Sequence, residues 1–136
     1  MPLAVTDSEL RQLLSEVSFL EHYGFQLHSF SDGECALLVP FRPAFERPGG
    51  VVSGQVFMAA ADVAMWLAIM TRLGAADGSV TAEMKTNFLS AARQEDFICA
   101  AKILKLGRRL IYGVAECSSR EGKLLAHHTI TYIRPN

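Results

Sequence analysis

One acidic residue, Asp62, stands in the middle of an apolar stretch that reads SGQVFMAAADVAMWLAIM over residues 53–70. Moving a carboxylate from water into apolar surroundings is unfavourable unless another group pairs with it or the protein uses it. Beside a cleft, such a carboxylate can attack a carbonyl carbon or take a proton from water. Asp62 is therefore the first candidate for a catalytic group, and two roles fit it: nucleophile and general base.

Gly54, at the start of the same stretch, is the second candidate. Hydrolysis of an acyl group needs hydrogen-bond donors for the oxyanion that forms on the carbonyl, as well as an activated nucleophile. The first amides of a helix lack intrahelical partners, and the helix dipole favours an anion beside them. Because Gly54 has no side chain, a carbonyl can approach it closely. We expect the amide of Gly54 or Gln55 to be the main oxyanion donor.

The spacing of these candidates limits how they can act together. Gly54 and Asp62 are eight residues apart, or about 12 Å along a helix. A reacting carbon has to lie within roughly 3–3.5 Å of each catalytic group, so one helix does not easily serve both. Two antiparallel helices related by a two-fold axis would place Gly54 of one chain opposite Asp62 of the other. We therefore expect a homodimer with two equivalent shared sites, alone or within a tetramer.

A helix and a set of strands are predicted around this stretch. Apolar residues at helical spacing after Thr6, a candidate N-cap, predict a first helix. The residues from Ser53 to Leu73 are apolar nearly all round, which predicts a helix buried on every side, with Gly74 as its C-cap. Alternating patterns bounded by turn residues predict strands at residues 25–30, 35–41, 79–90, 97–107, 109–119 and 123–133.

This order of elements predicts one α+β domain over residues 1–136, with an antiparallel sheet of five or six strands curled around the long helix. The short turns between the last strands suggest an antiparallel meander. One sheet covers only part of such a helix, so a second copy or another layer has to cover the rest. The helix approaches the length of a membrane span, but Gln55 and Asp62 interrupt it, and we expect no membrane segment.

Composition narrows the classes of function. Half of the 136 residues are hydrophobic and the net charge is −1, which argues against nucleic-acid binding. From Ala101 onward, seven Lys and Arg residues stand against two acids, which favours an anionic small molecule or forms a solvated polar face. Three cysteines without a CxxC pair predict neither a disulfide framework nor a metal site. The N-terminal residues lack the pattern of a secretory signal, so we expect a cytoplasmic protein.

The stretch RPGGVVSGQVFMAAADVAMW, residues 47–66, within this order of elements resembles the hotdog-fold acyl-CoA thioesterases, and most closely their phenylacetate-pathway subgroup. In this family a His-Gly-Gly tripeptide begins the central helix, and an acid follows the second Gly by seven residues. Ser53, Gly54 and Gln55 hold the tripeptide's place here, and Asp62 holds that of the acid. The strand MKTNFLSAA and the hairpin KLGRRLIYGVAECSSREGKLLAHHTITY are similar to later parts of the family's fold.

The resemblance implies a hotdog fold, a dimer with shared sites, and hydrolysis of an acyl-coenzyme A thioester, with coenzyme A as part of the substrate and no other cofactor. Thr81 matches a Ser or Thr position near the attacking water; it binds that water, orients Asp62, or is an ordinary strand residue. Arg47 stands where related enzymes have Asn or Gln; it holds an acyl carboxylate or a phosphate, or pairs with Glu46 or another surface acid. Ser53, in the place of the family's His, is a substrate-binding candidate; its hydroxyl is expected to cap the central helix rather than to act in catalysis.

The phosphates of coenzyme A would need cationic partners, and Arg binds phosphate well through its forked donors. The candidates in the turn KLGRR are Lys105, Arg108 and Arg109, and a weaker candidate is Arg93. A basic turn is also common on any protein surface. Three large apolar side chains of the central helix either shape an acyl pocket or belong to the core: Phe57, Met58 and Trp66.

Other chemistries fit the sequence less well. A hotdog hydratase would need a His near the helix start, and none lies between His28 and His127. A Ser-His-Asp triad lacks its Gly-x-Ser-x-Gly elbow. The neighbours His127 and His128 would point to opposite faces of a strand, which disfavours a shared metal. A non-catalytic acyl-CoA-binding protein stays open, because Ser53 and Gln55 replace the family's His and second Gly.

Overall fold

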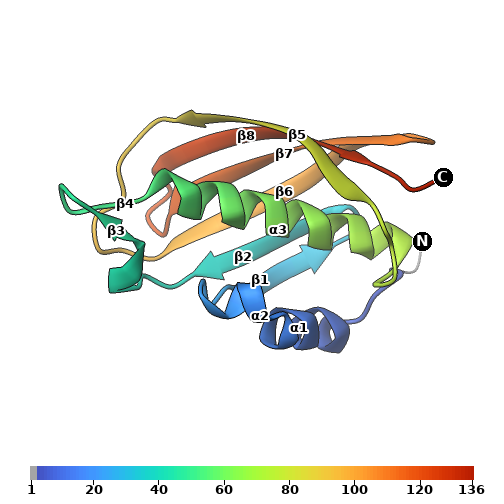
Figure 1. The fold of residues 1–136 in the computed structure, drawn as a ribbon, viewed down its shortest axis with the longest axis horizontal. Coiled ribbons are helices and arrows are strands. Elements are labelled where there is room, and N and C mark those ends of the chain that lie inside the picture. The colour runs from blue at the N-terminus through green and yellow to red at the C-terminus, as the bar shows by residue number, and fades with distance from the viewer. Residues whose placement is uncertain (1–2) are drawn as a thin grey trace.

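The computed structural model describes residues 3–136, and a six-stranded antiparallel sheet wraps around one long helix (Figure 1). The helix is α3 (Gly54–Leu73). The strands lie in the order β1-β2-β6-β7-β8-β5. Their bounds are β1 (Gln26–Ser31), β2 (Glu34–Val39), β5 (Val80–Phe88), β6 (Phe97–Leu106), β7 (Leu110–Ser119) and β8 (Leu124–Ile133). The expected α+β fold, a sheet curled around a central helix, is confirmed.

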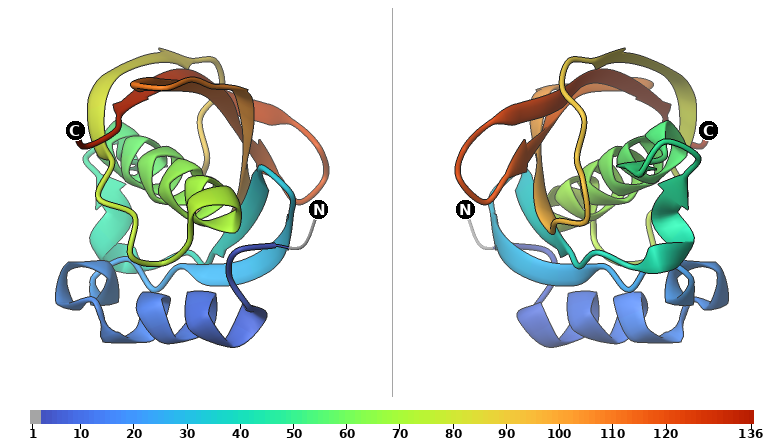
Figure 2. Two further views of the ribbon diagram at one scale, coloured as in Figure 1. Left: turned by 90° about the vertical axis from the view of Figure 1, so that its right-hand side faces the viewer. Right: turned by 90° about the vertical axis from the view of Figure 1, so that its left-hand side faces the viewer.

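The N-terminal residues form the predicted first helix, α1 (Asp7–Glu16), followed by the single turn α2 (Ser18–Glu21). Thr6 is the N-cap: its hydroxyl accepts from the Glu9 amide at 3.2 Å, and the Glu9 carboxylate accepts from the Thr6 amide at 3.0 Å. This reciprocal capping box begins the helix. Both views of Figure 2 show α1 and α2 below β1, on the side away from α3.

The predicted meander is correct for β6, β7 and β8 and wrong for β5. β5 pairs with β8, whereas β6 pairs with β2. Because β2 already occupies the other edge of β6, β5 has to join an outer edge of the sheet. A small hairpin precedes α3 and was not predicted; it consists of a 3₁₀ turn (Pro43–Phe45), β3 (Glu46–Arg47) and β4 (Val51–Val52).

Small residues allow α3 to lie close to the sheet. Ala60, Ala64 and Ala68 are completely buried on the helix. On β7, a Cβ at Gly113 would lie 2.3 Å from Met65 Cε and 2.5 Å from the Lys102 carbonyl oxygen. In length and composition α3 could cross a membrane. However, 67% of its most apolar 18-residue segment is buried inside the protein, as in the core helix of a globular domain.

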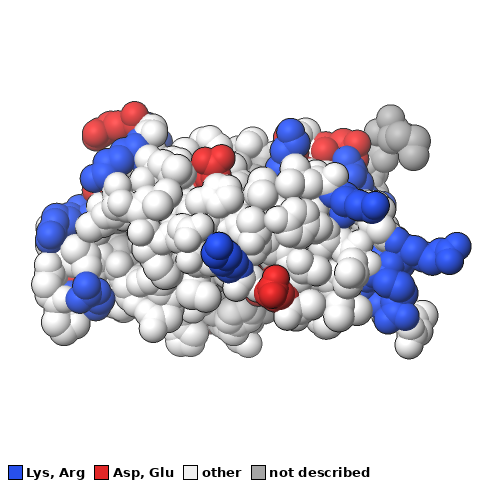
Figure 3. All heavy atoms as spheres, turned by 90° about the horizontal axis from the view of Figure 1, so that it is seen from above, with Lys and Arg blue, Asp and Glu red and all other residues white. Residues whose placement is uncertain are grey.

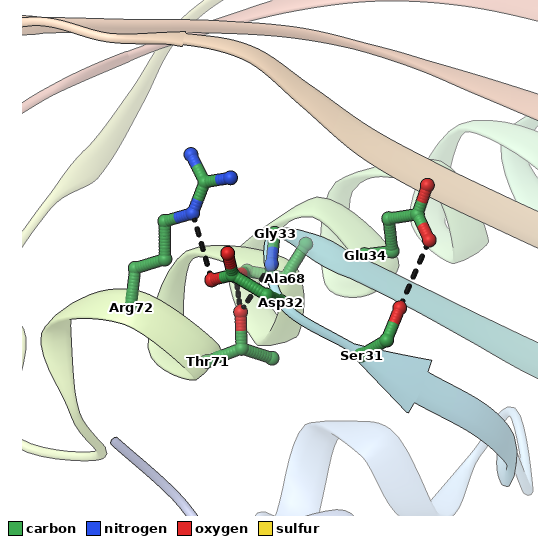
Figure 4. Close-up of polar contacts among 7 residues, drawn as sticks. All are labelled: Ser31, Asp32, Gly33, Glu34, Ala68, Thr71 and Arg72. Atoms are coloured by element: carbon green, nitrogen blue, oxygen red, sulfur yellow. Dashed lines mark hydrogen bonds and ion pairs between the residues drawn. The ribbon is translucent and has the colours of Figure 1, made fainter. Parts of the chain in front are cut away.

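The C-terminal end of α3 is fixed to the β1–β2 turn (Figure 4). The Thr71 hydroxyl accepts from the Gly33 amide at 2.9 Å and donates to the Ala68 carbonyl at 2.6 Å. Arg72 pairs with Asp32 at 3.0 Å across the same junction. The buried Thr71 contacts contribute more than this partly exposed ion pair, which water screens. After Leu73 the helix stops at Gly74, whose φ of 90° suits the predicted C-cap.

A buried polar contact lies between β5, β7 and β8. His128 is completely buried, with its Nδ1 2.8 Å from Thr86 Oγ1 and its Nε2 3.6 Å from Cys117 Sγ. Burial lowers the pKa of His128 from 6.5 to about 4, with a smaller contribution from His127. His128 is therefore neutral in the folded protein at neutral pH. Cys99 and Cys117 are buried free thiols, as expected of small core residues.

Gly113→Ala tests the close approach of α3 to β7. The added methyl group collides with a backbone carbonyl as well as with Met65, so we expect a loss of about 1–3 kcal/mol in the free energy of unfolding. Gly78→Ala is the matched control, because its Cβ would meet only Pro135 at 3.6 Å. Urea denaturation measures both variants, and equal stability of the two would contradict the packing described here.

The lowered pKa of His128 predicts a stability that depends on pH. Below pH 6.5 the unfolded chain binds a proton on this ring, whereas the folded protein does so only near pH 4. Stability should therefore decrease as the pH falls from about 6.5 to about 4, by up to roughly 3 kcal/mol from this residue. Denaturation of wild type and His128→Gln at pH 7.5 and 4.5 measures the contribution of His128 to the pH dependence of stability. An identical pH dependence in both proteins would rule it out.

Candidate active site

Two hydroxyl groups of the sheet hydrogen-bond the carboxylate of Asp62. The Thr81 hydroxyl on β5 donates to Oδ1 at 2.7 Å, and the Tyr132 hydroxyl on β8 donates to the same oxygen at 2.8 Å. The Tyr132 hydroxyl also lies 3.0 Å from the backbone carbonyl of Asp62. Asp62 is half-buried, so these donors replace part of the hydration that the carboxylate loses in the apolar helix.

Of these two donors, the sequence identified Thr81 and missed Tyr132. Among the alternatives for Thr81, the geometry agrees with contact to Asp62. Tyr132 is only 3% exposed, and a buried tyrosine hydroxyl usually finds a polar partner. That rule could have indicated that the Tyr132 hydroxyl has a polar partner, but it does not identify Asp62 as that partner. Burial, and then the charge of Asp62, raise the pKa of Tyr132, so its hydroxyl keeps its proton and remains a donor.

Asp62 opens into a cleft of about 280 Å³. Its wall combines apolar and aromatic side chains with one carboxylate and three hydroxyl groups; its lining residues are Phe19, Asp62, Val63, Trp66, Ser79, Val80, Thr81 and Tyr132. Trp66 thus belongs to the cleft, whereas Phe57 is a core residue at 3% exposure and Met58 is 38% exposed. A concave apolar wall with one ionisable group is a common form of small-molecule site.

The start of α3 offers amide donors, as the sequence predicted. The amides of Gly54 and Gln55 precede the first hydrogen bond at this end of the helix, which joins the Val56 amide to the Ser53 carbonyl at 3.0 Å. Gly54 lines a pocket of about 430 Å³ together with Arg47, Phe57 and Phe88. A Cβ at Gly54 would lie 3.0 Å from the Phe88 ring, so a larger residue would crowd this pocket.

The prediction that the Ser53 hydroxyl caps α3 is wrong. Ser53 is the N-cap residue through its backbone, but its side chain makes no hydrogen bond to the helix amides. The hydroxyl donates instead to Oε1 of Gln55. With its side chain directed at Gln55, Ser53 Oγ does not accept a hydrogen bond from the helix amides. The first amides of α3 are thereby left without a side-chain cap.

One protomer does not bring Asp62 and Gly54 to the same place. They lie two turns apart on α3, and the cleft at Asp62 shares no lining residue with the pocket at Gly54. The structure therefore has the acid and the predicted oxyanion donors as two separate half-sites within residues 3–136. This separation is the one that the eight-residue spacing predicts.

Two of the candidate binding arginines lie near the start of α3. Arg47 lines the Gly54 pocket and donates to the Pro48 carbonyl at 2.8 Å. Of the described residues, no acid forms an ion pair with Arg47, which removes the expected pairing with Glu46. Arg93 donates to the Gly49 carbonyl at 3.0 Å and so supports the loop before α3.

The candidates Lys105, Arg108 and Arg109 lie at the other end of the molecule. All three are exposed in or beside the β6–β7 turn, which Figure 1 places near the C-terminal end of α3. Figure 3 shows basic side chains gathered at this end. Arg134 adds to the group by donating to the Gly107 carbonyl at 2.9 Å. Within one protomer, the basic turn and the Gly54 pocket are not neighbours.

The histidines lie away from the cleft. His128 faces the core, and His127 is half-buried on the opposite face of β8, as alternation in a strand requires. In the part of the chain that the structure describes, no group of three His, Cys, Asp or Glu side chains is placed to hold a metal ion.

Comparisons with known proteins show the family of this chain. Residues 49–126 match the model of the family described as Thioesterase superfamily. A protein of Saccharolobus solfataricus named as an esterase is 35% identical over 68% of this chain and 65% of its own length. A second esterase-named protein of the same organism is 30% identical over 85% of this chain and 75% of its own length.

Solved structures show the same fold. A protein of Silicibacter described as a thioesterase matches with a TM-score of 0.89 and 28% identity, covering 100% of this chain and 96% of its own. A variant of the phenylacetic acid degradation protein PaaI from Thermus thermophilus matches with a TM-score of 0.79 and 25% identity, covering 88% and 100%. With the family match over more than half of the sequence, these findings support hydrolysis of a thioester and show that this chain belongs to the thioesterase superfamily.

Proposed function

We propose that the protein hydrolyses acyl-coenzyme A thioesters with Asp62 as the catalytic carboxylate, as a PaaI-like member of its family. The observation that carries this proposal is the environment of Asp62. Its carboxylate is oriented by two hydroxyls and opens into an apolar cleft, in a chain of the thioesterase superfamily. No other acid of the central helix is available, because Asp62 is the single acidic residue of α3.

Two routes are chemically balanced. In the first, Asp62 takes a proton from water while the water oxygen bonds to the thioester carbonyl carbon; collapse of the tetrahedral intermediate breaks the C–S bond, and the thiolate is protonated to coenzyme A. In the second, the carboxylate attacks the carbonyl and expels the thiolate, and water hydrolyses the resulting anhydride. In both routes the oxyanion needs amide donors, which the start of α3 can provide.

We propose that those donors come from a second copy of the chain. The outer edge of β5 pairs with no other strand among residues 3–136, and an unpaired apolar edge favours association. Large apolar side chains are also exposed on α2, on α3, at both ends of β5 and just after it: Phe19 at 55%, Met58 at 38%, Val80 at 62%, Phe88 at 55% and Leu89 at 55% exposure. A two-fold axis along this surface would set Asp62 against the partner subunit's Gly54.

The basic turn fits the phosphates of coenzyme A in this arrangement. Thr81, Tyr132 and Ile111 pair side by side across β5, β8 and β7. Leu110 precedes Ile111 as the first residue of β7, and it directly follows the turn that carries Arg108 and Arg109. The cations therefore lie at the same end of the sheet as Thr81 and Asp62. Arg guanidinium groups bind phosphate oxygens in bidentate fashion, so they suit the diphosphate of a substrate whose thioester reaches Asp62.

The lining of the Asp62 cleft favours an apolar acyl group. Phe19, Val63, Trp66 and Val80 contribute apolar surface there. We propose a cytoplasmic location, for which the three free thiols are the support, since a reducing compartment keeps thiols free. A non-catalytic acyl-CoA-binding protein is the second candidate, since the Ser53–Gln55 contact occupies the helix start where related enzymes have His and Gly.

Asp62→Asn tests the catalytic role. Replacing the carboxylate by an amide removes the base or nucleophile while keeping the size of the side chain, so thiol release should fall by at least roughly 100-fold. A panel of short, medium, long and aromatic acyl-CoAs measures it. Glu83→Gln is the control, because Glu83 is an exposed acid on the same strand as Thr81. Binding without turnover in wild type and variant alike would establish the non-catalytic alternative instead.

Mixing two inactive variants tests the shared site. Gly54→Val should obstruct the oxyanion donors, and Asp62→Asn removes the acid. In heterodimers of these variants one of the two sites is intact, so random subunit exchange should restore about one quarter of wild-type activity. Size-exclusion chromatography with light scattering should give at least twice the 14.9 kDa chain mass. A monomer, or a mixture that stays inactive after verified exchange, would refute shared sites.

A further inference from the structure

We propose that Tyr132 is a positioning residue that, together with Thr81, holds one carboxylate oxygen of Asp62 so that the other, Oδ2, performs the chemistry. This inference rests on the proposed thioesterase function. It begins from the arrangement of the two hydroxyls. Thr81 and Tyr132 are direct neighbours across β5 and β8. Directly opposed residues of two strands project from the same face of a sheet, and here both meet Asp62 on α3.

An irregularity in β5 affects the orientation of the Thr81 side chain, which meets Asp62 together with Tyr132. The β5–β8 register runs from Thr81 opposite Tyr132 to Glu83 opposite Thr131, so Ala82 is an extra residue on β5. Such a bulge bends the strand and redirects the side chains beside it. The bulge lies immediately after Thr81, the residue of β5 that hydrogen-bonds Asp62 on α3. Local strand geometry therefore supports the direction in which the Thr81 hydroxyl points.

The two donors differ in rigidity. Tyr132 is 3% exposed, and its ring is packed in the core, so its hydroxyl has little freedom to move. Thr81 is exposed on the edge strand and has contacts on fewer sides. The Tyr132 hydroxyl is accordingly the more rigid donor, and it determines the orientation of the Asp62 carboxylate. The Thr81 hydroxyl donates the second hydrogen bond from the solvent-exposed strand.

The hydrogen bonds distinguish the two carboxylate oxygens. Within residues 3–136, both side-chain donors to this carboxylate reach Oδ1. An oxygen that accepts two hydrogen bonds has less electron density left for a proton or a carbonyl carbon. Oδ2 keeps its lone pairs free. Oδ2 is therefore the atom that takes the proton of the attacking water, or that forms the bond to the acyl carbon, while the Tyr132 proton stays on its own oxygen.

Tyr132→Phe removes the hydroxyl and keeps the buried ring. With one donor lost the carboxylate can rotate, so we expect kcat to fall by roughly 10- to 100-fold, as for loss of a hydrogen bond to a charged group. KM should change less than about twofold and Tm only slightly, because the hydroxyl is committed to Asp62 and the buried ring stays in place. Tyr112→Phe on β7 is the control; Tyr112 is 41% exposed, and this variant should behave as wild type.

A double-mutant cycle with Thr81→Val separates orientation from a general structural effect. If both hydroxyls fix one oxygen, removing the first releases the carboxylate, and the second loss costs little more. Thr81→Ser should keep most of the activity, because it retains the hydroxyl. Wild-type kcat in Tyr132→Phe, a loss confined to KM, or a loss that follows a large drop in Tm would each overturn the proposal.

A spectroscopic measurement tests the inference independently of turnover. In protein labelled with ¹³C at the aspartate carboxyl carbon, the Asp62 signal is the one that disappears in Asp62→Asn. We expect this signal to move in Tyr132→Phe and Thr81→Val and to stay in place in Tyr112→Phe. An unmoved signal overturns the role of Tyr132. Absence of thioester hydrolysis in wild type, by contrast, would overturn the proposed function and leave this measurement to decide the orientation.

Discussion

The carboxylate of Asp62 inside an apolar helix is the constraint on which the rest of the structure depends. α3 has to be apolar because the sheet surrounds most of it, and the carboxylate on that helix loses hydration that only other polar groups can replace. Each hydrogen bond to a charged group contributes about 1.5–3 kcal/mol. Both donors come from the sheet and neither from the helix. The packing of α3 against the sheet therefore also determines where Asp62 meets its hydrogen-bond donors.

The order of the strands follows from the same requirement. In a continuous meander β5 would lie beside β6, and β6 and β7 would then separate it from β8. At about 4.8 Å between strands, Thr81 and Tyr132 would be roughly 14 Å apart and could not share one oxygen. The observed pairing of β5 with β8 makes them neighbours. The error about the topology and the failure to find Tyr132 thus have one cause, because both depend on which distant strands pair.

What the sequence predicted correctly is encoded locally. The capping box of Thr6 and Glu9 lies within four residues, and the helix end at Gly74 depends on one backbone conformation. Asp62 was found because a charge is conspicuous in an apolar helix. Tyr132 carries no such signal, since an aromatic residue in a strand is ordinary and its partner lies 70 residues earlier. The Ser53 prediction failed for a different reason: its side chain is directed at Gln55 and not at the helix amides.

In the dimer proposed above, the division of the site between two copies would separate two physical tasks. Thr81, Tyr132 and Asp62 belong to one chain, so the carboxylate is oriented before any partner or substrate arrives. The amides at Gly54 lie two turns away, so they can act on the same carbonyl only from a second α3. Orientation that is already present in the folded chain needs no reorganisation during the reaction. In the proposed dimer, the second copy would then contribute only the amides at the start of its α3 and not an entire site. Exposed apolar residues of α2 and β5, Phe19 and Val80, line the cleft of Asp62, so in the proposed dimer burial of this surface and completion of the site would be one event.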